Sequence, residues 1–127
     1  MLFRSGNKPI ISIKDVLIQL TPTGIMYWYD VDLASLIFNG TYSTNTWYYI
    51  VMAQSGTSIS AYKNGDFIQT QTGGNIGNSY NNKSIGSYLT LSRYWNGRIA
   101  LIQIYNKQLS STEISQNYNA LKSRFGL

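Results

Sequence analysis

The side chains that could carry acid–base or nucleophilic catalysis are few in this chain. It has five acidic residues, no His and no Cys, which excludes Ser-His and Cys-His arrangements. Hydrolysis of a glycosidic bond needs two carboxyl groups about 5 to 10 Å apart, and Glu113 is the single Glu. Asp30 and Asp32 can share one face of a strand, but without a Glu partner we interpret them as turn acids. We therefore predict a non-catalytic protein with no catalytic residues and no cofactor.

Tyr and Asn are the side chains that the sequence offers for recognition. A Tyr or Trp ring stacks on the apolar face of a sugar, and an Asn amide both donates to and accepts from hydroxyl groups. Two other interpretations stay open: the eleven Tyr suit β-sheets in general, and Trp95 suits a half-buried anchor of a turn. The candidate ligand-binding residues, all in or beside predicted loops, are Tyr42, Tyr80, Asn81, Asn82, Tyr88, Tyr94 and Trp95.

Length and charge restrict the class of protein. With 127 residues, a single domain over residues 1–127 is expected. The net charge is +5 with no run of basic residues, which argues against a nucleic-acid groove and allows attraction to anionic glycans or cell surfaces. Residues 1–5 lack the apolar core of a signal peptide, and no apolar run approaches membrane-spanning length. We expect neither a nucleic-acid partner nor membrane insertion.

Short apolar runs separated by turn residues predict a β-sandwich. Residues 1–9 form a loose lead-in. Residues 10–20 fit either a helix or two strands with a phase break at Lys14-Asp15, and their β-branched residues favour a strand in the second half. Residues 21–24 are turn residues that would pair 17–20 with 25–29 as a hairpin. Further short strands are expected at 33–38, 84–88, 90–92 and 99–105.

The clearest hairpin is predicted at Asn64-Gly65, a pair typical of two-residue β-turns. Before it, residues 47–53 are aromatic and β-branched on both faces, so we expect a central strand with Trp47 in the core. The turn joins strands 58–62 and 66–70. A two-residue loop then fixes three cross-strand pairs: Lys63 with Asp66, Tyr62 with Phe67, and Ala61 with Ile68.

The chain is expected to close with a bend, a strand and a helix. Gly97 lies at a bend that leads into the predicted core-lining strand 99–105. Ser110 and Glu113 have the spacing of a capping box, in which the Ser hydroxyl accepts from an amide and the Glu reaches back to the cap amide. Leu109 and Ile114 flank it at the spacing of a hydrophobic staple. Residues 109–127 are therefore predicted to be a C-terminal helical tail, with helix to about residue 121.

Two groups of motifs carry a resemblance to a known family. The first is Trp95-Asn96-Gly97-Arg98-Ile99 with residues 104–110 and Glu113-Ile114; the second is the Trp47 strand with Tyr62-Lys63-Asn64-Gly65. Together they resemble laminin-G-like, concanavalin A-like jelly-roll domains over residues 40–127. The tail 117–127 is similar to the ends of such domains in structural proteins of tailed phages. The resemblance implies an all-β, antiparallel β-sandwich of jelly-roll type with a short C-terminal helix.

The start of the chain departs from this family pattern. Full-length relatives begin with a strand carrying a Phe-Asp-Gly-like motif, followed by a Trp-bearing strand, and we find neither before Trp47. We interpret the chain as a domain without its front strands, either a fragment or a naturally shortened form. Missing strands would expose a sheet edge, so we expect strand pairing with a neighbouring chain or a homo-oligomer at that edge.

Some members of this family bind Ca²⁺ at the rim of the sandwich through Asp and carbonyl oxygens. The best local cluster here is Asp30, Asp32 and Asn39. Relatives often have Asp after the Gly-x-Ile of the closing motif, where this chain has Ala100. Calcium wants six to eight oxygen ligands, so these residues are a minor alternative and no metal is expected.

The resemblance points to a non-catalytic carbohydrate- or cell-surface-binding or structural module. It implies a phage virion, as a tail fibre or surface decoration, and hence a virion or extracellular location. The expected partner is a glycan or a virion or cell-surface protein. Two alternatives stay open: a carbohydrate-binding domain accessory to a secreted enzyme, and a protein-assembly module without a small ligand.

Overall fold

The fold is described by a computed structural model. It describes residues 2–3, 8–13, 16–20, 26–30, 33–38, 41–72, 83–87 and 94–127, with side chains for Ile18 and for 41–72, 84–87 and 94–127. The elements in chain order are β1 (Leu2–Phe3), β2 (Lys8–Ile13), β3 (Val16–Leu20), β4 (Met26–Asp30), β5 (Leu33–Phe38), β6 (Ile50–Ser55), β7 (Ser58–Lys63), β8 (Asp66–Thr72), β9 (Lys83–Ile85), β10 (Gly97–Arg98) and α1 (Ser111–Phe125).

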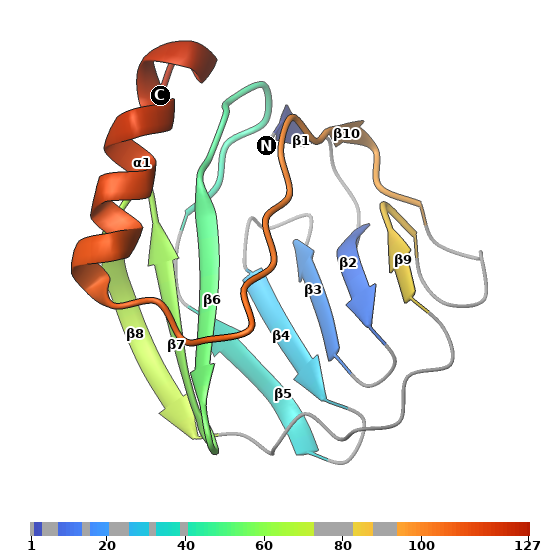
Figure 1. The fold of residues 1–127 in the computed structure, drawn as a ribbon. Coiled ribbons are helices and arrows are strands. Elements are labelled where there is room, and N and C mark those ends of the chain that lie inside the picture. The colour runs from blue at the N-terminus through green and yellow to red at the C-terminus, as the bar shows by residue number, and fades with distance from the viewer. Residues whose placement is uncertain are drawn as a thin grey trace.

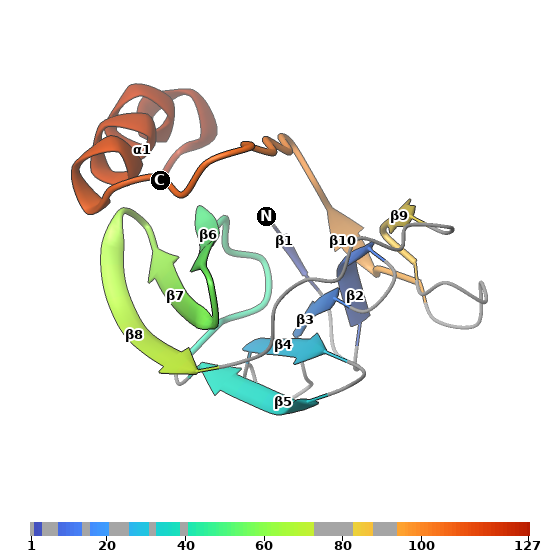
Figure 2. The ribbon, with the colours of Figure 1, turned by 60° about the horizontal axis from the view of Figure 1, so that its bottom comes forward.

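The strands form two larger antiparallel sheets and one short pair. One sheet has the order β5-β4-β3-β2-β9, the second has the order β6-β7-β8, and β1 pairs with β10. Figures 1 and 2 show that β5 and β8, which are in contact, bring the two sheets together along one side. The predicted all-β fold with a C-terminal helix is confirmed: it is an antiparallel β-sandwich with one helix.

The first core cluster lies between the two sheets. Ile59 and Ala61 of β7 are fully buried, and Ile18 of β3 in the facing sheet packs against them. Ile50 and Met52 of β6 contact the same cluster. Because side chains alternate along a strand, every second residue of β6 faces inward, and its other residues are left for the opposite face.

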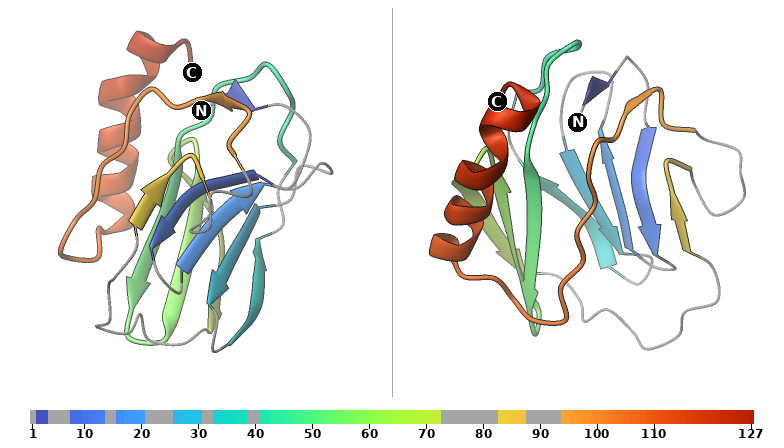
Figure 3. Two further views of the ribbon diagram at one scale, coloured as in Figure 1. Left: turned by 90° about the vertical axis from the view of Figure 1, so that its right-hand side faces the viewer. Right: turned by 45° about the horizontal axis from the view of Figure 1, so that its top comes forward.

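The second core cluster lies between the three-stranded sheet and α1. Ala53, Tyr62, Leu109 and Ile114 are buried together there. Figures 2 and 3 show α1 on the outer side of this sheet, away from the five-stranded one. β7 is therefore buried on both faces, which suits a strand in which four successive residues, 59–62, are buried.

The Asn64-Gly65 hairpin is confirmed, with one difference in register. Lys63 lies opposite Asp66 and Tyr62 opposite Phe67, as predicted. Ala61 lies opposite Gln69, and the predicted pairing with Ile68 is wrong because the register shifts between Ala61 and Tyr62. A β-bulge of this kind adds a residue to one strand and bends it. Sequence alternation alone does not reveal such an insertion.

The strands before residue 40 confirm one prediction and correct two others. Residues 10–20 follow the two-strand alternative, in β2 and β3, and β3 pairs with β4 as the predicted hairpin. Leu2–Phe3 and Lys8–Pro9 lie in strands within the segment predicted as a loose lead-in. The expectation that no Trp-bearing strand precedes Trp47 is wrong, because β4 contains Trp28.

The strand predicted over residues 47–53 differs from the observed one in its first residue and in its place in the sheet. β6 begins at Ile50 and is an edge strand that, among the described residues, pairs with β7 alone. Its apolar residues on both faces are still explained, since the two core clusters cover both faces. Trp47 precedes the strand and is half-buried, and its ring centroid lies 6.5 Å from that of Phe125 in α1. It packs on the helix rather than between the two sheets.

The core-lining strand predicted over residues 99–105 is wrong. Residues 99–105 contain no strand, since β10 ends at Arg98, and Ile104 is 73% exposed. Figures 1 and 3 show the segment crossing from β10 to the start of α1 beside β6. We attribute its irregular path to this crossing, because a strand needs a partner in continuous register. Ile99 still packs on the first core cluster.

Candidate recognition surface

Two backbone contacts between residues 86–87 and 94–95 position the candidate residues Tyr94 and Trp95. Ser87 and Tyr94 form an antiparallel bridge, and the Trp95 amide donates to the Gly86 carbonyl at 2.6 Å. Gly86 has φ +75°, a left-handed conformation that glycine adopts without a Cβ penalty. These contacts hold residues 86–87, which follow β9, against residues 94–95 and fix the backbone at Tyr94 and Trp95.

Tyr94 and Trp95 have different environments although they are adjacent. Trp95 is half-buried and packs against the first core cluster, which agrees with the interpretation of Trp95 as an anchor. Tyr94 is 57% exposed. The pair therefore combines a ring held by the core with a ring that faces solvent. An exposed Tyr on a fixed backbone is suited to stacking on an apolar surface.

Tyr42 lies in a different environment from Tyr94. It is 7% exposed, belongs to the first core cluster and meets the Tyr48 ring edge-on at 5.1 Å. Burial, with a smaller contribution from Tyr48, raises the pKa of Tyr42 to about 12. Its ring face is not open to a ligand, so the structure gives Tyr42 a packing role within the loop before β6.

Lys63 holds this loop through its ammonium group. Its Nζ lies 5.0 Å from the Tyr42 ring centre and 5.1 Å from that of Tyr48, and it donates to the Thr41 carbonyl at 2.7 Å. Such cation–π contacts are stabilising. Burial by itself raises the pKa of Tyr48, but the Ser43 amide that donates to its hydroxyl and the nearby Lys63 charge bring the pKa below its usual value.

The other predicted site residues lie outside what the structure describes. The side chain of Asp30, at the end of β4, is not described. The remaining residues lie outside the described ranges altogether: the ligand candidates Tyr80, Asn81, Asn82 and Tyr88, and the metal candidates Asp32 and Asn39.

Sequence reasoning missed a group of exposed apolar side chains on the final segment. Leu101, Ile104 and Tyr105 are all exposed. They lie on the segment that crosses beside β6, whose outer edge has no strand partner among the described residues. Their apolar pattern had predicted a buried strand, so no sequence signal distinguished them from core residues.

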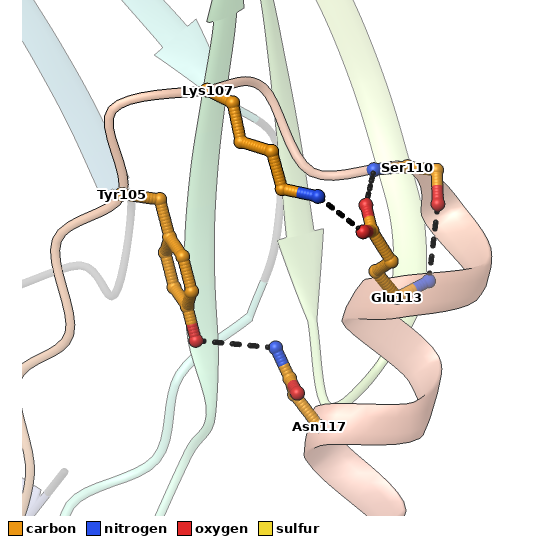
Figure 4. Close-up of polar contacts among 5 residues, drawn as sticks. All are labelled: Tyr105, Lys107, Ser110, Glu113 and Asn117. Carbon is orange, nitrogen blue, oxygen red and sulfur yellow. Dashed lines mark hydrogen bonds and ion pairs between the residues drawn. The ribbon is translucent and has the colours of Figure 1, made fainter.

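A polar cluster joins this segment to α1 (Figure 4). Asn117 Nδ2 donates to the Tyr105 hydroxyl at 3.3 Å, and Lys107 Nζ lies 2.6 Å from Glu113 Oε1. Burial and the nearby Tyr105 raise the pKa of Tyr49, while a hydrogen bond from Asn117 opposes the rise. These contacts orient the segment against the helix.

The capping box is confirmed, and it accounts for the chemistry of Glu113. The Ser110 amide donates to Glu113 Oε2 at 2.8 Å, and the Glu113 amide donates to Ser110 Oγ at 3.2 Å. The Lys107 hydrogen bond, followed by these cap contacts, lowers the pKa of Glu113 to about 2. A carboxyl group with so low a pKa stays ionised at neutral pH and does not serve as a general acid.

Within the described ranges, no three His, Cys, Asp or Glu side chains gather in a group that could hold a metal ion. Among the described helices, none has the length and apolar character to cross a bilayer.

The comparisons with known proteins bear on the fold. A solved structure of an S-layer domain-containing protein (residues 221–444) from Clostridium thermocellum is similar, with 16% sequence identity and a TM-score of 0.46. The match covers 93% of this chain and 65% of that structure. No curated protein matches the chain.

A family model described as the concanavalin A-like lectin/glucanases superfamily matches residues 4–115. The match begins well before residue 40, where the sequence resemblance was set, so it includes the first sheet as well as the closing motif. It ends within the first turn and a half of α1, which leaves most of the helix outside the match. Since most of the chain is matched, this protein belongs to the concanavalin A-like lectin/glucanases superfamily.

Proposed function

We propose that this protein is a non-catalytic module that binds a carbohydrate or a cell surface, with Tyr94 as its principal described contact. The observation that carries the proposal is the exposed Tyr94 ring beside the half-buried Trp95. Tyr supplies a large amphipathic contact area at a low cost in conformational entropy. The Ser87–Tyr94 bridge and the Trp95–Gly86 hydrogen bond fix the backbone before a ligand arrives, which reduces the ordering cost of binding.

The absence of catalysis is part of the same proposal. A glycosidase requires two suitably placed carboxyl groups. Glu113, the single Glu of the chain, is occupied by the capping box and Lys107. The other acidic residues of the sequence are four Asp. We therefore propose that the protein binds its ligand without cleaving a bond.

The proposed setting is a virion or the extracellular space. This setting follows the resemblance that the sequence of residues 117–127 suggests to the ends of domains in tailed-phage structural proteins. A tail fibre or surface decoration would meet glycans or cell-surface proteins of a host. The runner-up is a binding domain accessory to a secreted enzyme, and the genes next to this one distinguish the two most directly.

A glycan array with matched variants tests the binding role. Tyr94→Ala is expected to remove binding because it deletes the exposed ring. Tyr105→Ala is the matched control, since Tyr105 is also an exposed Tyr, 42% accessible, but its hydroxyl lies against Asn117 of α1. Loss of binding in Tyr94→Ala with retention in Tyr105→Ala supports the proposal. Unchanged binding in Tyr94→Ala, or no binding by the wild-type chain to any glycan, contradicts it.

A second candidate function is protein assembly through the edge of β6. It is favoured by the exposed Leu101 and Ile104 beside a strand edge that lacks a partner among the described residues. Unpaired edges accept an added strand. Light scattering tests this candidate: self-association that disappears in Ile104→Lys favours assembly, whereas a monodisperse monomer at all concentrations counts against pairing between copies.

A further inference from the structure

The chain has three Asn-Gly pairs, at residues 39–40, 64–65 and 96–97. Asn followed by Gly has an intrinsic reactivity, because glycine lacks the Cβ that would obstruct its backbone nitrogen. That nitrogen can attack the Asn side-chain carbonyl carbon. The Asn39 pair lies outside the described residues, whereas the other two can be compared directly.

Asn64 is held in a conformation that opposes this reaction. Its Oδ1 accepts from the Tyr49 amide at 2.9 Å, and its own amide donates to the Tyr49 carbonyl at 2.8 Å. It has φ +53° in the turn. The following Gly65 is covered by Tyr118, whose Cδ1 is only 2.8 Å from the position a Cβ would take. Ring closure at Asn64 therefore requires the hairpin to open locally.

Asn96 has few such restraints. Asn96, Gly97 and Arg98 are all exposed. Within the described ranges, no hydrogen bond ties the Asn96 side chain. Gly97 is held by the pairing of β10 with β1, in which each strand has two residues. So short a pairing opens at little cost, since strand termini fray most readily.

We propose that Asn96 is a site of spontaneous deamidation in the folded protein and that Asn64 is protected from it. The Gly97 nitrogen forms a bond to Asn96 Cγ, the Cγ–Nδ2 bond breaks, and ammonia leaves with the proton from Gly97. Water then opens the resulting succinimide at either carbonyl carbon, which gives Asp or isoaspartate. No oxidant or reductant takes part.

The product changes the surface next to Tyr94 and Trp95. Either product has one carboxylate in exchange for the neutral side-chain amide, which lowers the net charge locally by one. Isoaspartate also inserts an extra atom into the backbone directly before β10 and so disturbs its register with β1. The chemical step itself depends only on the two Asn-Gly environments and stands whether or not Tyr94 binds a glycan.

Peptide mapping by mass spectrometry tests the proposal on the full chain. Folded protein is aged in warm, mildly alkaline buffer, and a parallel sample is aged in urea to give each pair its intrinsic rate. Trypsin cuts after Arg93 and Arg98 and so isolates Asn96 in the peptide 94–98. Fragmentation locates Asn64 in the peptide that begins after Lys63. Chromatography separates the Asp and isoaspartate products.

The expected result is a difference in protection between the two pairs. Asn96 in the folded protein converts at close to its rate in urea, while Asn64 is slower than in urea by about tenfold or more, because it reacts only after local opening. Gly97→Ala should slow conversion at residue 96 in both samples. Equal protection of the two Asn residues, or faster conversion of Asn64 in the folded protein, would overturn the proposal.

Discussion

Ile104 and Ile114 belong to one continuous segment and have the same side chain, yet one is 73% exposed and the other is fully buried. Ile114 lies on α1, which covers the outer face of the three-stranded sheet, and it packs with Ala53 and Tyr62. Ile104 lies on the segment that crosses beside β6 without joining its sheet. The difference shows that an apolar side chain is buried only where the backbone has a partner surface against which to dock.

Truncating each isoleucine gives the largest expected contrast. Ile114→Ala should lower the free energy of unfolding by about 2 to 5 kcal/mol, because it leaves a cavity under the helix. Ile104→Ala should change it by no more than about 0.5 kcal/mol, as is usual for a surface site. Urea denaturation measures both. A comparable loss in Ile104→Ala would show that the crossing segment is part of the core.

Gly65→Ala tests whether the packing of α1 on the Asn64-Gly65 turn contributes to stability. A left-handed conformation costs an L-residue about 1 to 2 kcal/mol, and Gly65 has φ +85°. The new Cβ would also lie 2.8 Å from Tyr118 Cδ1. Gly56→Ala is the matched control, because Gly56 has φ +54° but no atom within 4 Å of its Cβ position.

Thermal denaturation should therefore show Gly65→Ala to be more destabilising than Gly56→Ala. Adding Tyr118→Ala to Gly65→Ala should remove the excess cost, which a double-mutant cycle measures. Equal losses in the two glycine variants would mean that the helix does not rest on the turn.

The start of α1 gives a smaller effect. Ser110→Ala should cost about 1 kcal/mol, because it removes the N-cap acceptor of the Glu113 amide. Ser111→Ala is the control, since Ser111 is the next residue, is exposed and is not the cap. Chemical denaturation of both variants compares them. If Ser111→Ala lost as much stability as Ser110→Ala, the capping hydrogen bond would not account for the loss.

The smallest expected effect is a dependence on pH through Glu113. Its pKa is about 2 in the folded protein against a usual 4.5, so the ionised carboxylate stabilises the fold. This contribution is present above pH 4.5 and is lost as pH falls toward about 2. It should be small because the group is exposed and solvent screens the Lys107 charge.

The difference in melting temperature between wild type and Glu113→Gln isolates that contribution. It should be constant at neutral pH and shrink as pH is lowered through this window. Added salt should reduce it further, as Lys107 is screened. A difference that grows on acidification would show that the sign of the linkage is wrong.

The parts of the fold that followed from the sequence are those encoded over a few residues. The Ser110–Glu113 capping box, the Leu109–Ile114 staple and the Asn64-Gly65 turn each need only near neighbours in the chain. The β3–β4 hairpin of the five-stranded sheet was also predictable, because the turn residues 21–24 separate two runs of strand-forming residues. The resemblance of the closing motif gave the superfamily, which the family match to residues 4–115 confirms.

The candidate site was less predictable. Tyr42 and Tyr94 are the same residue type in predicted loops, and only the packing shows that one is a core residue and the other is exposed. The bulge between Ala61 and Tyr62 also depends on how β7 fits between its neighbours. Exposure and register arise from contacts between distant residues, so local patterns do not determine them.

The sequence by itself determined the Asn64-Gly65 turn, the helix start and the superfamily of this protein. Short-range hydrogen bonds and backbone preferences fix the turn and the helix start, and the motifs carry the superfamily. The tertiary structure alone decided that β7 is buried on both faces, that Trp47 packs on α1, and that residues 99–105 are not a strand. The physical reason is that strand pairing and burial are completed by surfaces far away in the chain, whose positions follow from the fold as a whole.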